Sequence, residues 1–185
     1  DRFDALIREV QRTGEGGGTP TATRAPEDER FWADDDYLDL NRRFLEAGWT
    51  DGLPIIPPTR ALVTEVLAGT TRPADEVIAE LPPRNGLATV EKVAVNAVMA
   101  GCRPEHLPVV IAAVRAMVPE TFSLNHVVTT AHTLSPLIVV NGPIVQRIGL
   151  SCGRDVTAKG WMPNATIARA VRLVLFNCAA DLESR

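Results

Sequence analysis

The segment TVEKVAVNAVMAGCRPEHLPVVIAAVRAM, residues 89–117, is the most regular part of the chain and decides its fold class. In its first half, apolar residues recur at helical spacing: Val90, Val93, Ala94, Ala97 and Val98. Thr89 is a suitable N-cap for this helix, and Gly101 is a typical stop signal. Pro104 suits the first turn of a second helix, which we expect to run to about residue 117. The segment therefore predicts a helical hairpin with a corner at residues 101–104.

The composition of the chain is that of an ordinary globular domain. It has 185 residues, of which 45% are hydrophobic and 23% charged, with a net charge of −4. An acidic balance argues against binding to nucleic acid or to anionic membranes, because both need basic surfaces. No apolar run approaches the ~18 residues of a membrane span, and residues 1–12 do not resemble a signal peptide. We therefore expect a cytoplasmic protein without nucleic-acid or membrane partners.

Further helices and strands are expected on both sides of the hairpin. Helices are predicted from residues 34–36 to about 47, over 60–67 after the cap Thr59, and from about 163 onward. Single helical turns are predicted at 74–80 and 144–148, strands at 124–130 and 136–140, and a glycine-rich loop at 150–163. The order is not a regular βαβ alternation. It predicts an α+β fold, helix-rich, with a small mixed sheet.

Residues 1–30 differ in composition from the rest. Residues 1–13 carry apolar side chains at helical spacing and are predicted to form an N-terminal helical arm. Residues 14–30 include a Gly-, Thr- and Pro-rich stretch and are predicted to be a linker. Residues 31–185 are expected to form a single α+β domain.

The stretch TDGLPIIPPT, residues 50–59, is predicted to be a rigid extended wall. Its prolines remove backbone donors and restrict φ, so it is unsuited to the centre of a sheet. We expect it to line a pocket or to pair with the edge of another subunit.

Four segments, in order along the chain, resemble those of a bacterial protein family. They are TDGLPIIPPT, ATVEKVAVNAVMAGCRPEHLPVVIAAV, SPLIVVNGPI and NATIARAVRLVL, and the resemblance covers roughly residues 48–178. Members of this family accompany, or are fused to, a thiol or selenocysteine domain called UGSC, and are labelled thiol-disulfide oxidoreductases. The resemblance implies a redox or thiol-assisted enzyme of which this chain is one domain or subunit.

The chain departs from the family pattern in two places. It has no UGSC or CGSC segment, the nearest being Ser151-Cys152-Gly153, so a reactive thiol would have to come from another chain. The loop before Asn164 carries Asp155, Lys159, Trp161 and Met162 where the family would have more Gly and Asn. Substrate preference is expected to differ accordingly.

Five residues are candidates for catalysis. Cys102 and His106 lie four apart at the hairpin corner, where the helix start and the imidazole would lower the thiol pKa; the alternative is a buried apolar Cys beside a surface His. Glu91 is a candidate general base, or an ordinary first-turn acid. His126 and His132, six apart on a predicted strand, would share one face and could transfer protons. These histidines could bind a metal ion together with Cys102 or Glu91. Ligand pairs at metal-binding spacing are lacking, however, so no metal site is predicted.

Seven residues are candidates for substrate binding, all at turns or helix starts. They are Asp51, Gly52, Asn141, Gly142, Ser151, Gly153 and Asn164. Turn backbone and a helix N-terminus can hold an anion, and Arg169 and Arg172 of the last helix could assist, although Arg172 also fits an ordinary surface charge.

The sequence thus favours an enzyme subunit, an oxidoreductase or lyase, acting on a small polar or anionic organic molecule. The alternatives are a non-catalytic scaffold for a catalytic partner and a binding module without chemistry. We expect the chain to form a homo-oligomer or a hetero-oligomer. In a hetero-oligomer, the partner would be a UGSC-type subunit. The sequence identifies no cofactor.

Overall fold

The computed structural model describes residues 37–130, 134–153, 156 and 160–179. The fold is α+β and helix-rich, as predicted, with one two-stranded antiparallel sheet among these residues. The elements are α2 (Tyr37–Glu46), α3 (Arg60–Leu67), β1 (Val77–Leu81), β2 (Gly86–Thr89), α4 (Val90–Ala100), α5 (Leu107–Ala116), α6 (Leu124–Thr129), α7 (Ile144–Arg147) and α8 (Met162–Val174). Short 3₁₀ turns lie at Pro104–His106 and Glu120–Phe122, and a π-helical turn at Leu175–Ala179 follows α8. The predicted arm and linker, residues 1–30, lie outside the described residues.

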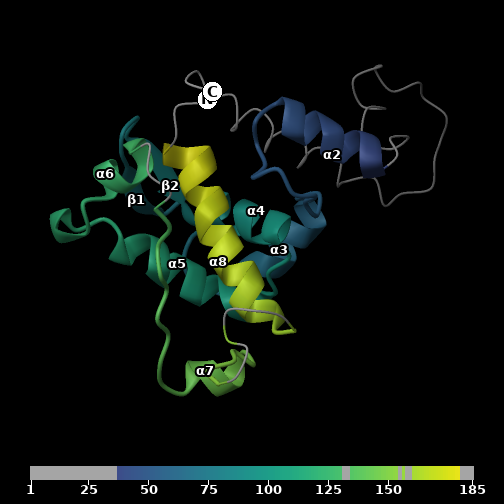
Figure 1. The fold of residues 1–185 in the computed structure, drawn as a ribbon. Coiled ribbons are helices and arrows are strands. Elements are labelled where there is room, and N and C mark those ends of the chain that lie inside the picture. The colour runs from purple at the N-terminus through teal and green to yellow at the C-terminus, as the bar shows by residue number, and fades with distance from the viewer. Residues whose placement is uncertain (1–36, 131–133, 154–155, 157–159, 180–185) are drawn as a thin grey trace.

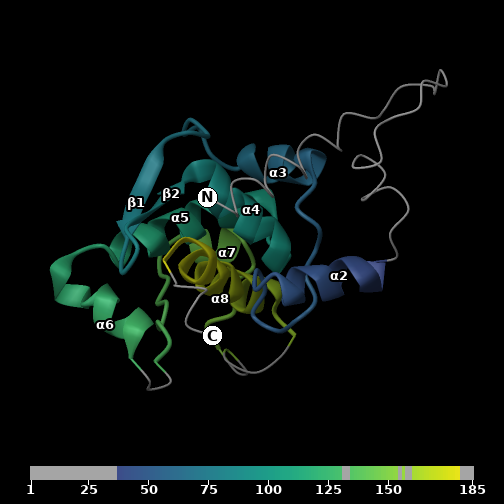
Figure 2. The same ribbon diagram turned by 90° about the horizontal axis from the view of Figure 1, so that it is seen from above.

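The core is organised around α4. Nine of its residues are buried, and it packs against α3, α5 and α8. Figure 1 shows α8 crossing in front of α4 and α5, and Figure 2 shows α8 nearly end-on with α2 and the β-hairpin on opposite sides. A helix buried on nearly every side needs apolar or small residues all round, and residues 93–100 fit this apart from Asn96, whose amide group is hydrogen-bonded to the Lys92 carbonyl and to Asn177.

The predicted helical hairpin is confirmed. The Thr89 hydroxyl accepts a hydrogen bond from the Lys92 amide at 3.2 Å, and Gly101 ends α4 in the left-handed region with φ of 87°. Thr59 caps α3 in the same way by accepting from the Leu62 amide. Caps of this kind satisfy donors at the first turn that have no intrahelical partner.

The sheet lies where the sequence predicted a helical turn. Residues 77–81 form β1, which pairs with β2 in antiparallel register, Leu81 opposite Gly86 and Glu80 opposite Leu87. Ala79 and Leu81 of β1 are buried, as alternate residues on one face of a strand. The prediction at 74–80 was wrong because β2, at residues the sequence left unassigned, supplies the hydrogen-bonding partner.

The two predicted strands are not part of this sheet. Residues 124–129 form α6, in which the Thr129 hydroxyl donates to the Asn125 carbonyl one turn earlier. Residues 136–140 are extended but have no strand partner in the described part of the chain. β-branched residues favour strands only when a neighbouring strand can pair with them.

The remaining helix predictions hold. The turn at 144–148 is α7, and the last helix begins at Met162, close to the expected start. No single helix among the described residues is long and apolar enough to cross a membrane, whereas the bent pair Pro104–Ala116 and Glu120–Thr129 meets that test by length and composition only.

Candidate binding site

The extended stretch at residues 50–59 runs between α2 and the end of α4. The Ile55 amide donates to Asn41 of α2 at 2.6 Å, and the Tyr37 hydroxyl donates to the Ile55 carbonyl at 3.0 Å. The Ile56 amide donates to the carbonyl of Met99 at 3.2 Å. The predicted rigid wall is therefore present, held by helices and not by the edge of a sheet.

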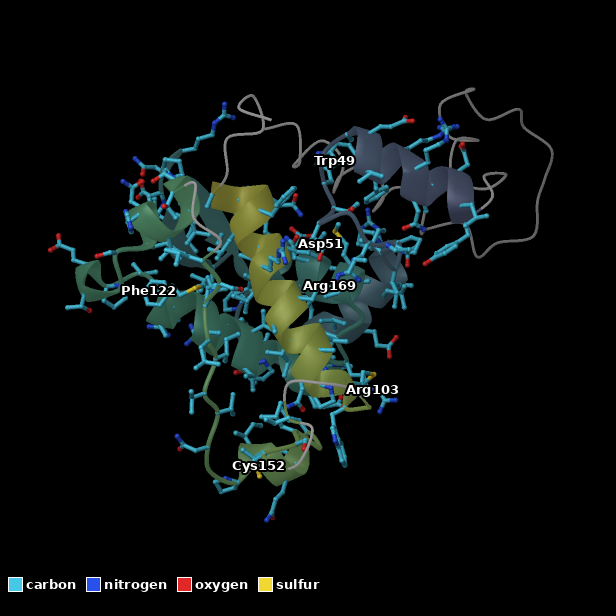
Figure 3. The ribbon with its side chains drawn as sticks, viewed as in Figure 1. Trp49, Asp51, Arg103, Phe122, Cys152 and Arg169 are labelled. Carbon is cyan, nitrogen blue, oxygen red and sulfur yellow. The ribbon has the colours of Figure 1, made fainter. Side chains whose placement is uncertain are left out.

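A buried ion pair joins the start of this wall to α8. Arg169 donates through Nε to one oxygen of Asp51 at 3.2 Å and through Nη2 to the other at 3.0 Å. Nη2 also donates to the carbonyls of Leu53 and Pro54. Figure 3 shows Asp51 and Arg169 close together beside α8, and the side chain of Asp51 is only 5% exposed.

Arg169 determines the ionisation of Asp51. Burial alone would raise the pKa of this carboxyl, but the hydrogen bonds and the charge of Arg169, with help from backbone amides, lower it below its usual value. A carboxylate in a bidentate pair with a guanidinium stays ionised at neutral pH.

Beside this pair is a pocket of about 350 Å³ between α8, the start of the wall and the extended segment at 134–140. Its walls are mostly apolar or small. The lining residues are Asp51, Leu53, Ser135, Pro136, Ile138, Ala165, Ala168, Arg169, Val171 and Arg172. The size is that of a small-molecule site.

Arg172 supplies the charge of this pocket. It lies one turn after Arg169 on α8, is exposed, and makes no ion pair with any residue that the structure describes. Arg169, in contrast, is already bound to Asp51 and two carbonyls. The pocket therefore has one guanidinium held in the protein and one available to a ligand.

Of the seven predicted binding residues, Asp51 alone lines this pocket. Gly52 has a φ of 90° and turns the chain into the wall. Asn141 and Gly142 are exposed at the start of α7, where the Gly142 carbonyl accepts from the Val145 amide. The structure thus separates the turn at 141–142 from the pocket.

Asn164 has a structural role. Its Oδ1 accepts from the Ser151 amide at 2.9 Å, and its Nδ2 donates to the carbonyls of Ser151 and Val156 at 2.9 and 3.1 Å. The side chain therefore fixes the loop that carries Cys152 and Gly153, both exposed. Its hydrogen-bonding groups are used by the protein itself.

For Cys102 the structure favours the alternative of a buried apolar side chain over activation by His106. Cys102 is buried, and burial raises its pKa to about 12 despite a hydrogen bond with Thr166. His106 is buried as well, and its Nδ1 accepts from the Arg103 amide at 3.1 Å, so it closes the hairpin corner. Burial also lowers the pKa of His106, which keeps the ring neutral at pH 7.

The other catalytic candidates do not gather in one place. Glu91 is half-buried in the first turn of α4, and its amide donates to the Ala74 carbonyl. His126 is exposed on α6, so the expectation that it shares a strand face with His132 was wrong; His132 lies outside the described residues. The described residues contain no group of three His, Cys, Asp or Glu side chains that could hold a metal ion.

Sequence reasoning missed most of the pocket. Ala165, Ala168, Arg169 and Arg172 lie three or four apart on α8, and this spacing alone marks one helix face. The opposite wall, residues 135–138, comes from a segment expected to be a strand in a sheet.

The chain matches no protein-family model, no curated protein and no solved structure.

Proposed function

We propose that this chain is the ligand-binding subunit of a bacterial enzyme and that its ligand is a small organic anion. The observation that carries the proposal is Arg172, an exposed guanidinium in a pocket with largely apolar walls. The enzyme itself is inferred from the resemblance to proteins that accompany the UGSC domain.

The composition of the pocket favours a carboxylate with a short apolar body. A guanidinium binds a carboxylate through two parallel hydrogen bonds, which gives both affinity and orientation. Leu53, Pro136 and Ile138 provide apolar surface for the rest of the molecule. The Asp51 carboxylate, paired with Arg169, would repel a ligand that placed negative charge at that end.

The reactive group is assigned to another chain. Cys102 is a buried neutral thiol, and Cys102, His106, Glu91 and His126 are not among the residues that line the pocket. A thiol from a UGSC-type subunit would supply the chemistry, an oxidoreductase or lyase step, with this chain holding the substrate.

The test is calorimetric titration of the purified chain with a panel of small mono- and dicarboxylates. We expect at least one to bind, and Arg172→Gln to weaken it by about 10-fold or more, since a charge-assisted hydrogen bond contributes about 1.5–3 kcal/mol. The matched control is Arg115→Gln, which removes an exposed arginine of α5 outside the pocket and should leave affinity unchanged.

Two results would overturn the proposal: no binding by any carboxylate of the panel, or equal affinity of the wild type and Arg172→Gln. The scaffold alternative predicts the first of these, together with stable binding to a catalytic partner chain.

A further inference from the structure

The extended segment at residues 134–141 leaves apolar side chains and backbone groups uncovered. Exposure alternates along the segment. Leu137 is 85% exposed and Val139 is 77% exposed, whereas Ile138 and Val140 are half-buried against the core. None of the backbone amides or carbonyls of 134–141 hydrogen-bonds to another described residue. Figure 1 shows this segment as the long connection that descends beside α8 to α7.

The two edges of such a segment are not equivalent. In an extended chain, successive residues direct their N–H and C=O groups to opposite edges. Residues 134, 136, 138 and 140 share one edge, which lacks a donor at Pro136. Residues 135, 137, 139 and 141 share the other edge, where every residue keeps its amide hydrogen. One complete strand edge thus has no hydrogen-bonding partner among the residues that the structure describes.

We propose that a second copy of this chain pairs with this edge, antiparallel, about a twofold axis at Ile138. In this register, Ser135 lies opposite the second copy's Asn141, and Leu137 lies opposite the second copy's Val139. Both of these are hydrogen-bonded pairs. Pro136 lies opposite the second copy's Val140 in a non-hydrogen-bonded pair, so its missing N–H removes no hydrogen bond between the two strands.

The occupant is a second copy because the segment is complementary to itself. Residues 134–143, LSPLIVVNGP, carry no charge, so an antiparallel pair with itself places no like charges opposite each other. The pairing also sets exposed Leu137 against exposed Val139 twice, as an isologous interface requires. Since Pro136 and Ile138 also line the pocket, the second copy's strand would border it.

The first experiment is sedimentation velocity on the full chain between about 1 and 100 µM, a range suited to a small reversible interface. We expect a monomer–dimer equilibrium that Leu137→Asp shifts to monomer across this range, because the charge is then buried opposite an apolar residue. The control is Leu38→Asp, which changes a similarly exposed leucine (72%) on α2 and should leave the equilibrium unchanged.

The second experiment tests the register by cross-linking. In a Cys152→Ser background, Ser135→Cys combined with Asn141→Cys should give a disulfide-linked dimer under mild oxidation, since hydrogen-bonded pairs have Cα atoms about 5.5 Å apart. Ser135→Cys alone should not, because its symmetry mate would be roughly 20 Å away along the strand.

The proposal is overturned by a chain that stays monomeric at about 100 µM, or by a dimer that Leu137→Asp does not weaken. It is also overturned if hydrogen exchange finds the amides of 135, 137 and 139 protected in a monomer, since another part of the same chain would then cover the edge. All of these measurements are made without ligand, so a negative result would refute the dimer and would leave the proposed function to be judged by the titration.

Discussion

A thiol acts as a nucleophile only when it is ionised, and the position of Cys102 works against ionisation. Its sulfur lies at the corner between α4 and α5, buried among apolar residues, and its pKa is raised to about 12. The start of a helix normally favours a thiolate, but here the desolvation of the charge outweighs that effect. Cys102 is therefore a packing residue.

Alkylation measures this directly. For the native protein at pH 8, we expect iodoacetamide to label the exposed Cys152 rapidly and to leave the buried Cys102 and Cys178 unmodified. Cys152→Ser should abolish rapid labelling, and denaturation in urea should expose all the cysteines that remain. Rapid native labelling of Cys102 in the Cys152→Ser variant would show that its thiol ionises and would reopen its role as a nucleophile.

At the scale of elements, the close packing of the β-hairpin on the π-helical turn depends on a glycine. A Cβ at Gly86 would lie 1.8 Å from the carbonyl oxygen of Cys178, a contact that requires the backbone to move. The same π turn is tied to the rest of the fold by Asn177, whose Nδ2 donates to Asn96 of α4 and to the Trp49 carbonyl. The turn therefore joins β2, α4 and Trp49, the residue that precedes the extended wall.

We expect Gly86→Ala to lower the free energy of unfolding by about 3 kcal/mol, at the upper end of the range for overpacking. The matched control is Gly153→Ala, because a Cβ there meets no atom within 4 Å; its effect should stay within about 0.5 kcal/mol. Urea denaturation followed by circular dichroism measures both. Equal midpoints for the two variants would mean that the contact between β2 and the π turn relaxes without cost.

At the scale of the whole molecule, the Asp51–Arg169 pair connects residues 118 positions apart in the chain. It joins the extended wall to α8 and forms one end of the pocket. Because the folded protein lowers the pKa of Asp51, its ionisation stabilises the fold. This contribution is present above the unfolded pKa of about 3.9 and is lost as the pH falls through the lower folded value.

Asp51→Asn should therefore cost about 1–3 kcal/mol at pH 7, because the variant leaves the partly buried guanidinium of Arg169 without its carboxylate. Between pH 5 and pH 3, about the range in which the unfolded carboxyl titrates, the difference between wild type and variant should shrink. Asp39→Asn, which removes the ion pairs of Asp39 with Arg42 and Arg43 at the surface of α2, is the control and should cost less. A difference that stayed constant across this range would exclude the linkage.

Local patterns in the amino-acid sequence were enough to predict the helix caps and most of the helices. Thr59, Thr89 and Gly101 start or end helices because capping satisfies backbone groups within a few residues, so each cap can be recognised without knowledge of the rest of the fold. The helical hairpin, the last helix and the α+β class followed from such signals and from apolar spacing. Asp51 was also identified, although as a turn residue and not as the partner of Arg169.

The pairing of extended segments and the set of residues that share the pocket depend on tertiary contacts. Residues 77–81 become a strand because residues 86–89 lie beside them. Residues 124–129, of which half are β-branched, pair with no strand in the described part of the chain and form α6. The pocket joins Arg169 and Arg172 of α8 to residues 51–53 and 135–138. Strand pairing and pockets are made of contacts between distant parts of the chain, and no local pattern encodes which parts will meet.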